Sequence, residues 1–172
     1  YPGRYFRKAS AAERAKDLAW ARETVDLCVD LGIPVMRVLS GPGEDLEGLD
    51  DLAAALRETC RYAAPRGVRL GIETHHGNPT VRTDWTKTIF DAVGMDNLGL
   101  LYDPGNLAPG GTYKETAKAF APRLFHVHFK NVVLDAAGRK AVAWADPDKG
   151  AVDYDWVIKA LNDDLPFDQF TI

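Results

Sequence analysis

The chain alternates between short apolar runs and longer segments in which apolar residues recur at helical spacing. A short run rich in aliphatic residues is typical of a strand buried on both faces, and the longer spacing is typical of an amphipathic helix. The runs predict strands over residues 33–39, 68–73, 98–103, 124–129 and 167–172. The periodic segments predict helices over residues 10–31, 49–63, 84–93 and 154–161, and one that begins at 112. This alternation indicates an α/β fold of parallel strand–helix units.

Two local patterns add detail to the helices. In the first helix, the apolar stripe is expected along Leu18, Arg22, Val25, Cys28 and Val29. In the helix that begins at residue 112, Thr112 and Glu115 have the spacing of a capping box, in which each side chain bonds the backbone N–H of the other residue.

Polar side chains stand at the carboxyl ends of three consecutive predicted strands. Glu73, Asp103 and His128 each close such a strand. Because side chains alternate between the faces of a strand, the opposite face should carry the layers that helices cover, which are Val68, Leu70, Ile72, Leu98, Leu100, Tyr102, Phe125, Val127 and Phe129. The carboxyl ends of parallel strands meet at one edge, where α/β folds place their chemistry, so the three polar side chains should lie close together.

Two carboxylates and an imidazole suit one divalent metal ion, with Mn²⁺, Mg²⁺, Co²⁺ and Zn²⁺ all open. The competing interpretation is purely structural. In it, Glu73 pairs with Arg69 or Lys130, and Asp103 caps the helix that follows it. For one carboxylate alone the structural interpretation is favoured, but three polar groups in register on neighbouring strands favour a metal site.

Composition excludes several classes of protein. The chain has 172 residues, of which 46% are apolar and 27% charged, and no run approaches the roughly 18 apolar residues that span a bilayer. The formal net charge of −4 gives no overall positive field for nucleic acid. Cys28 and Cys60 fall in different helical segments and form no spaced disulfide framework, which fits a reducing compartment and a cytoplasmic location.

Four segments together carry a resemblance to a known family. They read GIETH at 71–75, YDPGN at 102–106, HVHFK at 126–130 and GAVDY at 150–154. In this order and spacing they resemble the xylose isomerase-like TIM barrel superfamily of sugar and sugar-phosphate isomerases and epimerases. The resemblance implies a (β/α)8 barrel to which residues 1–172 contribute one partial domain, about strands four to eight, cut at both ends. It also implies Glu73, Asp103 and His128 as metal ligands, with a fourth ligand expected just after Ile172.

The resemblance further implies a reaction. In the related enzymes the metal polarises a carbonyl, and a carboxylate removes the neighbouring proton, so Glu73 is the expected base as well as a ligand. A dehydratase acting on inosose or dehydroshikimate is an alternative on the same scaffold. A DNA-repair endonuclease is less consistent with the sequence, because Asn106 and residues 146–150 lack its additional histidines. A non-catalytic barrel remains a further alternative.

The expected partner is a small sugar or polyol, with no nucleic acid or membrane partner and with a homo-oligomer left open. Residues expected to contact the substrate are His75, Asn106, Lys130 and Trp144. Asn106 stands where the epimerases often carry a histidine, which departs from the ketose 3-epimerase pattern. Three nearby residues are expected in supporting positions: Arg37 paired with Glu73, His126 hydrogen-bonded one layer below His128, and His76 in solvent.

Overall fold

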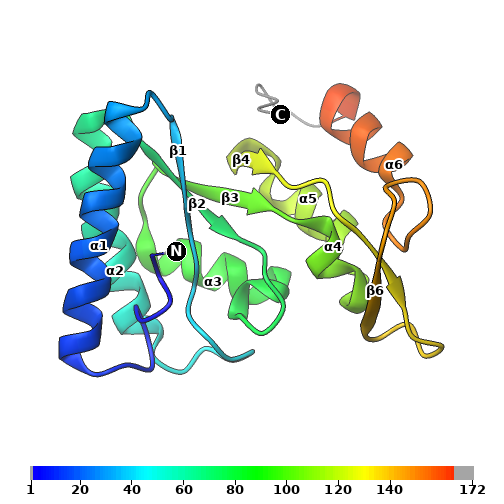
Figure 1. Ribbon diagram of the computed structural model, residues 1–172, viewed down its shortest axis with the longest axis horizontal. Coiled ribbons are helices and arrows are strands. Elements are labelled where there is room, and N and C mark those ends of the chain that lie inside the picture. Colours follow the sequence, from blue (N-terminus) through cyan, green and yellow to red (C-terminus); the bar gives the residue numbers. More distant parts are fainter. Residues whose placement is uncertain (1, 165–172) are drawn as a thin grey trace.

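The computed structural model of the protein describes residues 2–164 (Figure 1). Its main sheet has four strands in the order β1-β2-β3-β4, all parallel. The strands are β1 Val35–Val38, β2 Arg69–Glu73, β3 Leu98–Tyr102 and β4 Leu124–Val127. The first four predicted strands are therefore confirmed, each somewhat shorter than its apolar run. The predicted strand over 167–172 lies outside the described residues.

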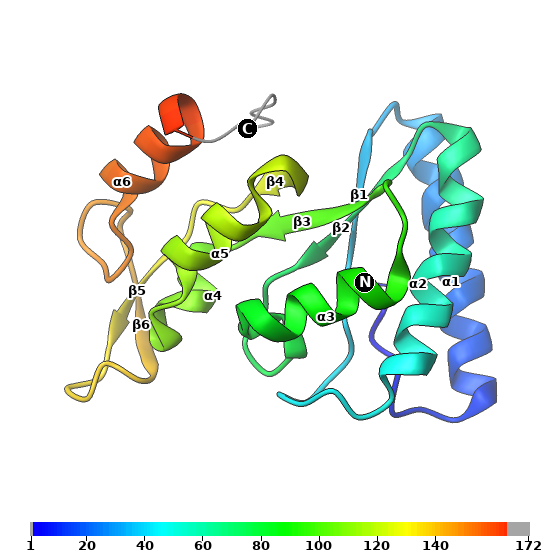
Figure 2. The ribbon, with the colours of Figure 1, turned by 180° about the vertical axis from the view of Figure 1, so that it is seen from behind.

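Helices connect the strands and cover one face of the sheet. The longer ones are α1 Ala11–Asp30, α2 Leu49–Ala63, α3 Thr83–Val93 and α5 Tyr113–Phe120, with shorter α4 Pro104–Leu107 and α6 Tyr154–Lys159. Single-turn 3₁₀ helices are η1 Ala64–Arg66, η2 Pro79–Val81, η3 Ala108–Gly110 and η4 Ala121–Arg123, and a π-helical segment, η5 Ala160–Asp164, follows α6. Figure 2 shows α3 and α5 in front of the strands, and Figure 1 shows the opposite face, which these helices leave uncovered.

The core lies between the sheet and these helices. Leu70 and Ile72 of β2 and Leu98 and Leu100 of β3 are fully buried, as the alternation predicts. Removing such side chains from water contributes about 1.5–3 kcal/mol each to folding. This packing fixes which face of β2 and β3 points away from the helices, and so fixes the direction of Glu73.

The fourth strand does not follow simple alternation. Leu100 pairs with Leu124 but Leu101 pairs with His126, so Phe125 is an extra residue in a β-bulge. The prediction that Phe125 faces the helices is wrong, because its ring lies over Gly99, at 2.3 Å from the position a Cβ there would take. Phe129 was also expected in the helix-covered layer, yet it is 50% exposed, with its ring stacked on Tyr154.

The capping box occurs at a different helix from the predicted one. Ser10 and Glu13 cap α1 reciprocally, since Ser10 Oγ accepts the N–H of Glu13 and Glu13 Oε2 accepts the N–H of Ser10. Thr112, in contrast, makes no side-chain capping bond to α5, because its backbone is already helical there and its hydroxyl donates to the carbonyl of Val81. The Thr112–Glu115 capping box is therefore a wrong prediction.

The buried stripe of α1 is also rotated relative to the prediction. Its buried residues are Asp17, Ala21, Val25 and Cys28. Val29 is 46% exposed and Arg22 donates to Glu58 at the surface, so neither belongs to the stripe. Asp17 is buried because its carboxylate accepts the N–H groups of Gly3 and Tyr5, a role that apolar periodicity does not reveal.

A β-hairpin follows β4, in a part of the chain for which the sequence predicts neither strand nor helix. Strands β5 Asn131–Leu134 and β6 Ala141–Ala145 pair antiparallel as a separate sheet. The buried Asn131 side chain then joins the hairpin to the chain before α6. Its amide donates to the carbonyls of Pro147 and Val152, and its oxygen accepts the N–H of Val152. The hairpin is thus anchored beside the carboxyl end of β4, at the right of Figure 1.

Candidate metal centre

Three polar side chains converge at the carboxyl ends of β2, β3 and β4. Glu73, Asp103 and His128 each offer one ligand atom, and these atoms lie within 4.8 Å of one another. Glu73 is 3% and Asp103 1% exposed, and the His128 side chain is 35% exposed. Within residues 2–164 no other group of three or more acidic, histidine or cysteine side chains has this geometry. The predicted convergence of these three residues is therefore present in the structure.

Buried threonine hydroxyls hold the backbone of this centre. Thr80 Oγ1 donates to the carbonyl of Glu73 at 2.6 Å. Thr74 Oγ1 accepts the N–H of Asp103 at 2.8 Å and lies 3.3 Å from its carbonyl. Both threonines are fully buried. Because β2 and β3 end at this point, these hydroxyls replace the ladder bonds that would otherwise fix the two acidic residues.

Glu73 is an ionised carboxylate held on two sides. Arg37 Nε donates to Oε2 at 2.9 Å and a second guanidinium nitrogen donates to the same oxygen, which confirms the predicted pairing. His128 Nδ1 lies 3.3 Å from Oε1. Burial alone raises the pKa of Glu73, but the bonds from His128 and Arg37 outweigh it, so the pKa lies below its usual value. Glu73 is therefore charged at neutral pH.

The two carboxylate oxygens of Asp103 have different partners, one in α4 and one in the metal centre. Oδ1 accepts the N–H of Asn106 and caps α4, as the structural interpretation predicts. Oδ2 faces the cluster, 2.7 Å from Lys130 Nζ and 3.5 Å from His128 Nδ1. The pairing of Lys130 or Arg69 with Glu73 is not observed. Lys130 pairs with Asp103 instead, and the Arg69 guanidinium lies over the ring of Phe125.

The pKa values of His126, in β4, and of His128, just after it, are shifted in opposite directions. Hydrogen bonds to Asp103 and then to Glu73 raise the pKa of His128 to about 9. Burial, followed by repulsion from His128, lowers the pKa of His126, whose ring lies edge-on at 5.6 Å from that of His128. Without a metal, His128 thus carries a proton that balances the two carboxylates, whereas His126 favours the neutral form.

The donor set fits a divalent cation. Two carboxylate oxygens and one imidazole nitrogen are ligands that Mn²⁺, Co²⁺, Zn²⁺ and Mg²⁺ accept in proteins, and the hydrogen bonds of Arg37 and of α4 hold the carboxylates from behind. The two carboxylates also need positive charge beside them. In this structure the His128 imidazole and the Lys130 ammonium supply it, and a bound cation would do the same. The residues present therefore suit a metal.

The predicted substrate contacts divide into two groups. Asn106, 4% exposed, accepts Lys130 Nζ at 2.8 Å, and its amide donates to the carbonyl of Thr74. Trp144 on β6 is 73% exposed, with Lys130 Nζ at 5.4 Å from its ring centroid. Lys130, which pairs with Asp103, thus links two of the other three predicted residues, Asn106 and Trp144, to the centre. His75 does not join them, since it lies in the loop after β2 and hydrogen-bonds the carbonyl of His76.

A groove of about 760 Å³ lies beside Asn106 and Trp144, and none of the three candidate ligands lines it. The groove is lined from three sides by η2, α4 and the hairpin, and its walls include His76, Val81, Asn106, Val132 and Trp144. His76 is exposed, as expected, and its Nδ1 also lies 3.0 Å from Asn106 Oδ1. The sequence did not indicate the contact of His76 with Asn106, because β2 ends at Glu73 and strand alternation says nothing about the loop that follows.

A parallel sheet that gathers carboxylates and an imidazole at its carboxyl end is typical of α/β barrel proteins that bind a metal. The chain belongs to the xylose isomerase-like TIM barrel family, whose model matches residues 1–172. The predicted family and fold class are therefore confirmed. No curated protein matches the chain. Among helices within residues 2–164, none combines the length and apolar character that a membrane crossing needs.

Several solved structures share the fold. The IOLI protein with a bound zinc atom is 21% identical, with a TM-score of 0.82, over 96% of this chain and 62% of that one. A probable 3-DHS dehydratase, AsbF from Bacillus anthracis, is 19% identical, with a TM-score of 0.77, over 95% and 64%. A D-allulose 3-epimerase from Methylomonas sp. is 20% identical, with a TM-score of 0.72, over 92% and 56%. The chain spans less than two thirds of the length of each.

Proposed function

We propose that the complete gene product is a divalent-metal-dependent isomerase or epimerase acting on a small sugar or sugar phosphate. The convergence of Glu73, Asp103 and His128 carries this proposal. A divalent ion bound there would polarise a substrate carbonyl and acidify the neighbouring C–H. The similarity in fold to an epimerase and to a zinc-binding protein supports the proposal.

Glu73 is the proposed base. Its lowered pKa keeps it ionised at neutral pH, so it is ready to accept a proton. Arg37 holds Oε2, which leaves Oε1 on the side of His128, toward the face of the sheet that α3 and α5 leave uncovered. Arg37 thereby fixes the direction from which a proton can reach the carboxylate. The role of Arg37 is orientation, since its own bonds go to the oxygen that faces away from His128.

Lys130, Asn106 and Trp144 are the proposed substrate contacts, and the structure gives each a chemical reason. Lys130 offers an ammonium to a hydroxyl, carboxylate or phosphate, and Asn106 holds that ammonium in place. Trp144 offers an exposed aromatic face to the apolar side of a sugar ring. His75 keeps its predicted role as a contact from the loop after β2, at the edge of the same end of the sheet.

Metal binding tests the proposal first. Titration of the complete gene product with Mn²⁺, Co²⁺ and Zn²⁺ should show one site. H128A removes a ligand, so it should weaken binding by more than the roughly 10–100-fold that loss of a group orienting a ligand costs. H75A is the matched control, because it removes a histidine outside the cluster. Absence of divalent-ion binding, or equal affinities for H128A and the unchanged protein, would refute the metal centre.

Turnover tests the reaction. A panel of ketoses, aldoses and their phosphates should show interconversion that E73Q reduces by about 10²–10⁴-fold, the contribution of one general base. Exchange of solvent deuterium into the substrate at the reacting carbon should accompany it. Loss of water from inosose or dehydroshikimate, with no sugar interconversion, would instead identify a dehydratase.

A further inference from the structure

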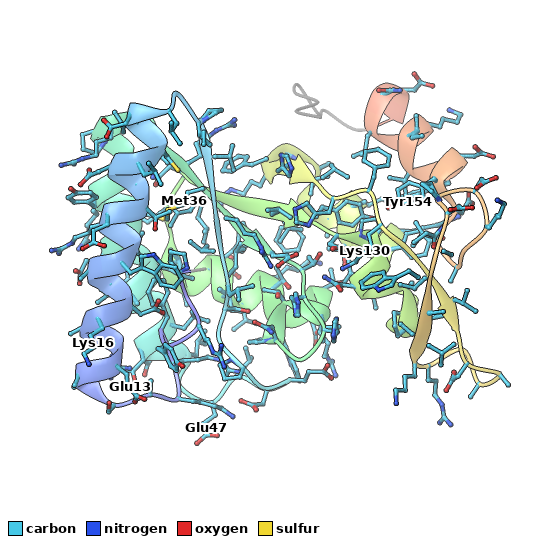
Figure 3. All side chains as sticks on the ribbon, viewed as in Figure 1. Glu13, Lys16, Met36, Glu47, Lys130 and Tyr154 are labelled. Carbon is cyan, nitrogen blue, oxygen red and sulfur yellow. The ribbon has the colours of Figure 1, made fainter. Side chains whose placement is uncertain are left out.

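Tyr154, at the start of α6, clamps the segment that links the metal centre to the hairpin. Its hydroxyl accepts the N–H of Lys130 at 2.6 Å and donates to the Lys130 carbonyl at 2.9 Å. The same hydroxyl lies 3.4 Å from the carbonyl of His128. Both Tyr154 and Lys130 are labelled in Figure 3, where α6 meets the segment that follows β4. One side chain thus contacts the backbone of a candidate ligand and of a candidate substrate contact.

Within residues 2–164, the backbone of the clamped segment has few other hydrogen bonds. Strand β4 ends at Val127 and β5 begins at Asn131, so residues 128–130 belong to neither sheet. The bond from the N–H of His128 to the carbonyl of Tyr102, at 2.9 Å, is the last contact with β3. Beyond it, the Tyr154 hydroxyl satisfies both backbone groups of Lys130, a task that a strand partner would otherwise perform.

The tyrosine is itself rigidly held. It is 6% exposed, and its ring stacks on Phe129 with a centroid distance of 5.0 Å. Asp153, the preceding residue, caps α6 through the N–H of Trp156 and pairs with Lys114 of α5. The burial and the ring stacking therefore place the Tyr154 hydroxyl against the backbone of Lys130.

We propose that Tyr154 is a positioning residue of the metal centre, whose hydroxyl fixes His128 and Lys130 in the arrangement that a divalent ion requires. This inference rests on the proposed function, because it assigns Tyr154 to the same centre. Tyr154 touches none of the ligand atoms and acts only through the backbone of residues 128–130. A small displacement of this backbone moves the imidazole relative to Glu73 and Asp103, which the threonine hydroxyls hold independently.

The chain supplies a matched control in Tyr113. Its hydroxyl also accepts a backbone N–H, that of Asp153 at 3.2 Å, and its side chain is nearly as buried, at 9% exposure. Y154F and Y113F thus remove the same atom from similar surroundings and leave both rings in place. Only Y154F removes a bond to the segment between β4 and β5. The Tm of both variants, measured first, shows whether each one folds.

The deciding experiment compares Mn²⁺ binding by calorimetry with the ¹⁵N chemical shifts of the histidine rings. We expect Y154F to weaken Mn²⁺ binding by about tenfold, the low end for groups that orient ligands, and Y113F to stay within about twofold. In the metal-free protein, Y154F should shift the ring nitrogens of His128 but not those of His75.

Equal Mn²⁺ affinities and unchanged His128 shifts in Y154F would overturn the inference, as would equal losses in the two variants. If the unchanged protein bound no Mn²⁺, the proposed function would fail on its own. The His128 shifts in the metal-free protein would then still decide whether Tyr154 positions this residue.

Discussion

The ammonium of Lys130 lies 2.7 Å from Oδ2 of Asp103, the same oxygen that faces the candidate metal position. Lys130 therefore neutralises some of the negative charge of Asp103 that a divalent ion would otherwise neutralise. The ammonium also has two other contacts in reach, Asn106 Oδ1 at 2.8 Å and the face of Trp144. A bound cation and this ammonium repel each other, so Lys130 sets the affinity of the centre as well as its substrate contacts.

Replacing Lys130 by methionine should strengthen metal binding and weaken the metal-free fold. Removal of the competing charge should raise the affinity for Mn²⁺ by about tenfold, as for a modest screened repulsion. The buried Asp103 loses a partner, so the free energy of unfolding without metal should fall by about 3 kcal/mol, and added Mn²⁺ should restore it. Calorimetry and urea denaturation measure the two effects. K149M, at an exposed ion pair with Asp146, is the control, and weaker Mn²⁺ binding by K130M would contradict the prediction.

Metal affinity should rise with pH because His128 must lose its proton to bind. Asp103 and Glu73 raise the pKa of His128 to about 9 from 6.5. The association constant for Mn²⁺ should therefore increase about tenfold per pH unit from pH 6.5 and level off near pH 9. The stability of the metal-free fold, in contrast, should fall as pH rises. The stabilisation from protonated His128 is complete below pH 6.5 and is lost as pH rises through 9.

Calorimetry at pH 6, 7 and 8 in buffers of different ionisation enthalpy measures the proton release directly. We expect about one proton per Mn²⁺ bound at pH 7. An affinity that stays constant over this range would show that His128 binds no metal, or that its imidazole is already neutral.

The close approach of Phe125 to Gly99 makes a prediction about the bulge in β4. A Cβ at Gly99 would meet the Phe125 ring at 2.3–2.5 Å, and Gly99 lies in β3, so G99A must displace the ring or the strand. Overpacking of this kind costs about 1–3 kcal/mol of the free energy of unfolding. G110A is the control, because its nearest contacts lie at 3.8 Å. Urea denaturation of both variants measures the difference, and a G99A protein as stable as G110A would argue against the observed bulge.

The bulge also marks a position where strand alternation in the sequence does not predict the direction of a side chain. Alternation predicted the faces of β2 and β3, because Leu70, Ile72, Leu98 and Leu100 occur in uninterrupted strands. The same rule failed at Phe125, since an inserted residue reverses the phase and leaves no mark in an apolar run. The convergence of Glu73, Asp103 and His128 was nevertheless predictable. Each stands at or just beyond its own strand end, and the bulge at Phe125 comes before both His126 and His128, so it leaves their relative phase unchanged.

The partners within the site were harder to predict. The sequence indicated that Arg37 reaches Glu73, because both lie on the same face of neighbouring strands. It did not indicate that Lys130 pairs with Asp103 and not with Glu73, because this depends on the path of the chain between β4 and β5. The sequence also does not predict the hairpin, since Ala141–Ala145 is almost entirely exposed and carries none of the burial pattern of a core strand.

Arg7 should be among the side chains most sensitive to substitution, although it lies outside the metal centre. Its side chain is fully buried and donates to the carbonyls of Ser40, Pro42, Gly43 and Glu47 and to Asp45. These bonds hold the loop between β1 and α2. Lysine offers a point charge in place of the planar fork, so R7K should leave several carbonyls unpaired and cost about 2–4 kcal/mol of the free energy of unfolding.

The loop that Arg7 holds reaches the groove, so a second effect should accompany the loss of stability. Gly43 donates to the carbonyl of Gly77 at 2.7 Å, and Glu44, a groove residue, accepts the N–H of Gly77. Amide hydrogen exchange in R7K should therefore speed up at both glycines, while Asp103, held by Thr74, stays protected. R4K is the control, because Arg4 is exposed and should change stability by less than about 0.5 kcal/mol. Equal stability and exchange in R7K and R4K would mean that the loop holds its shape without the Arg7 guanidinium.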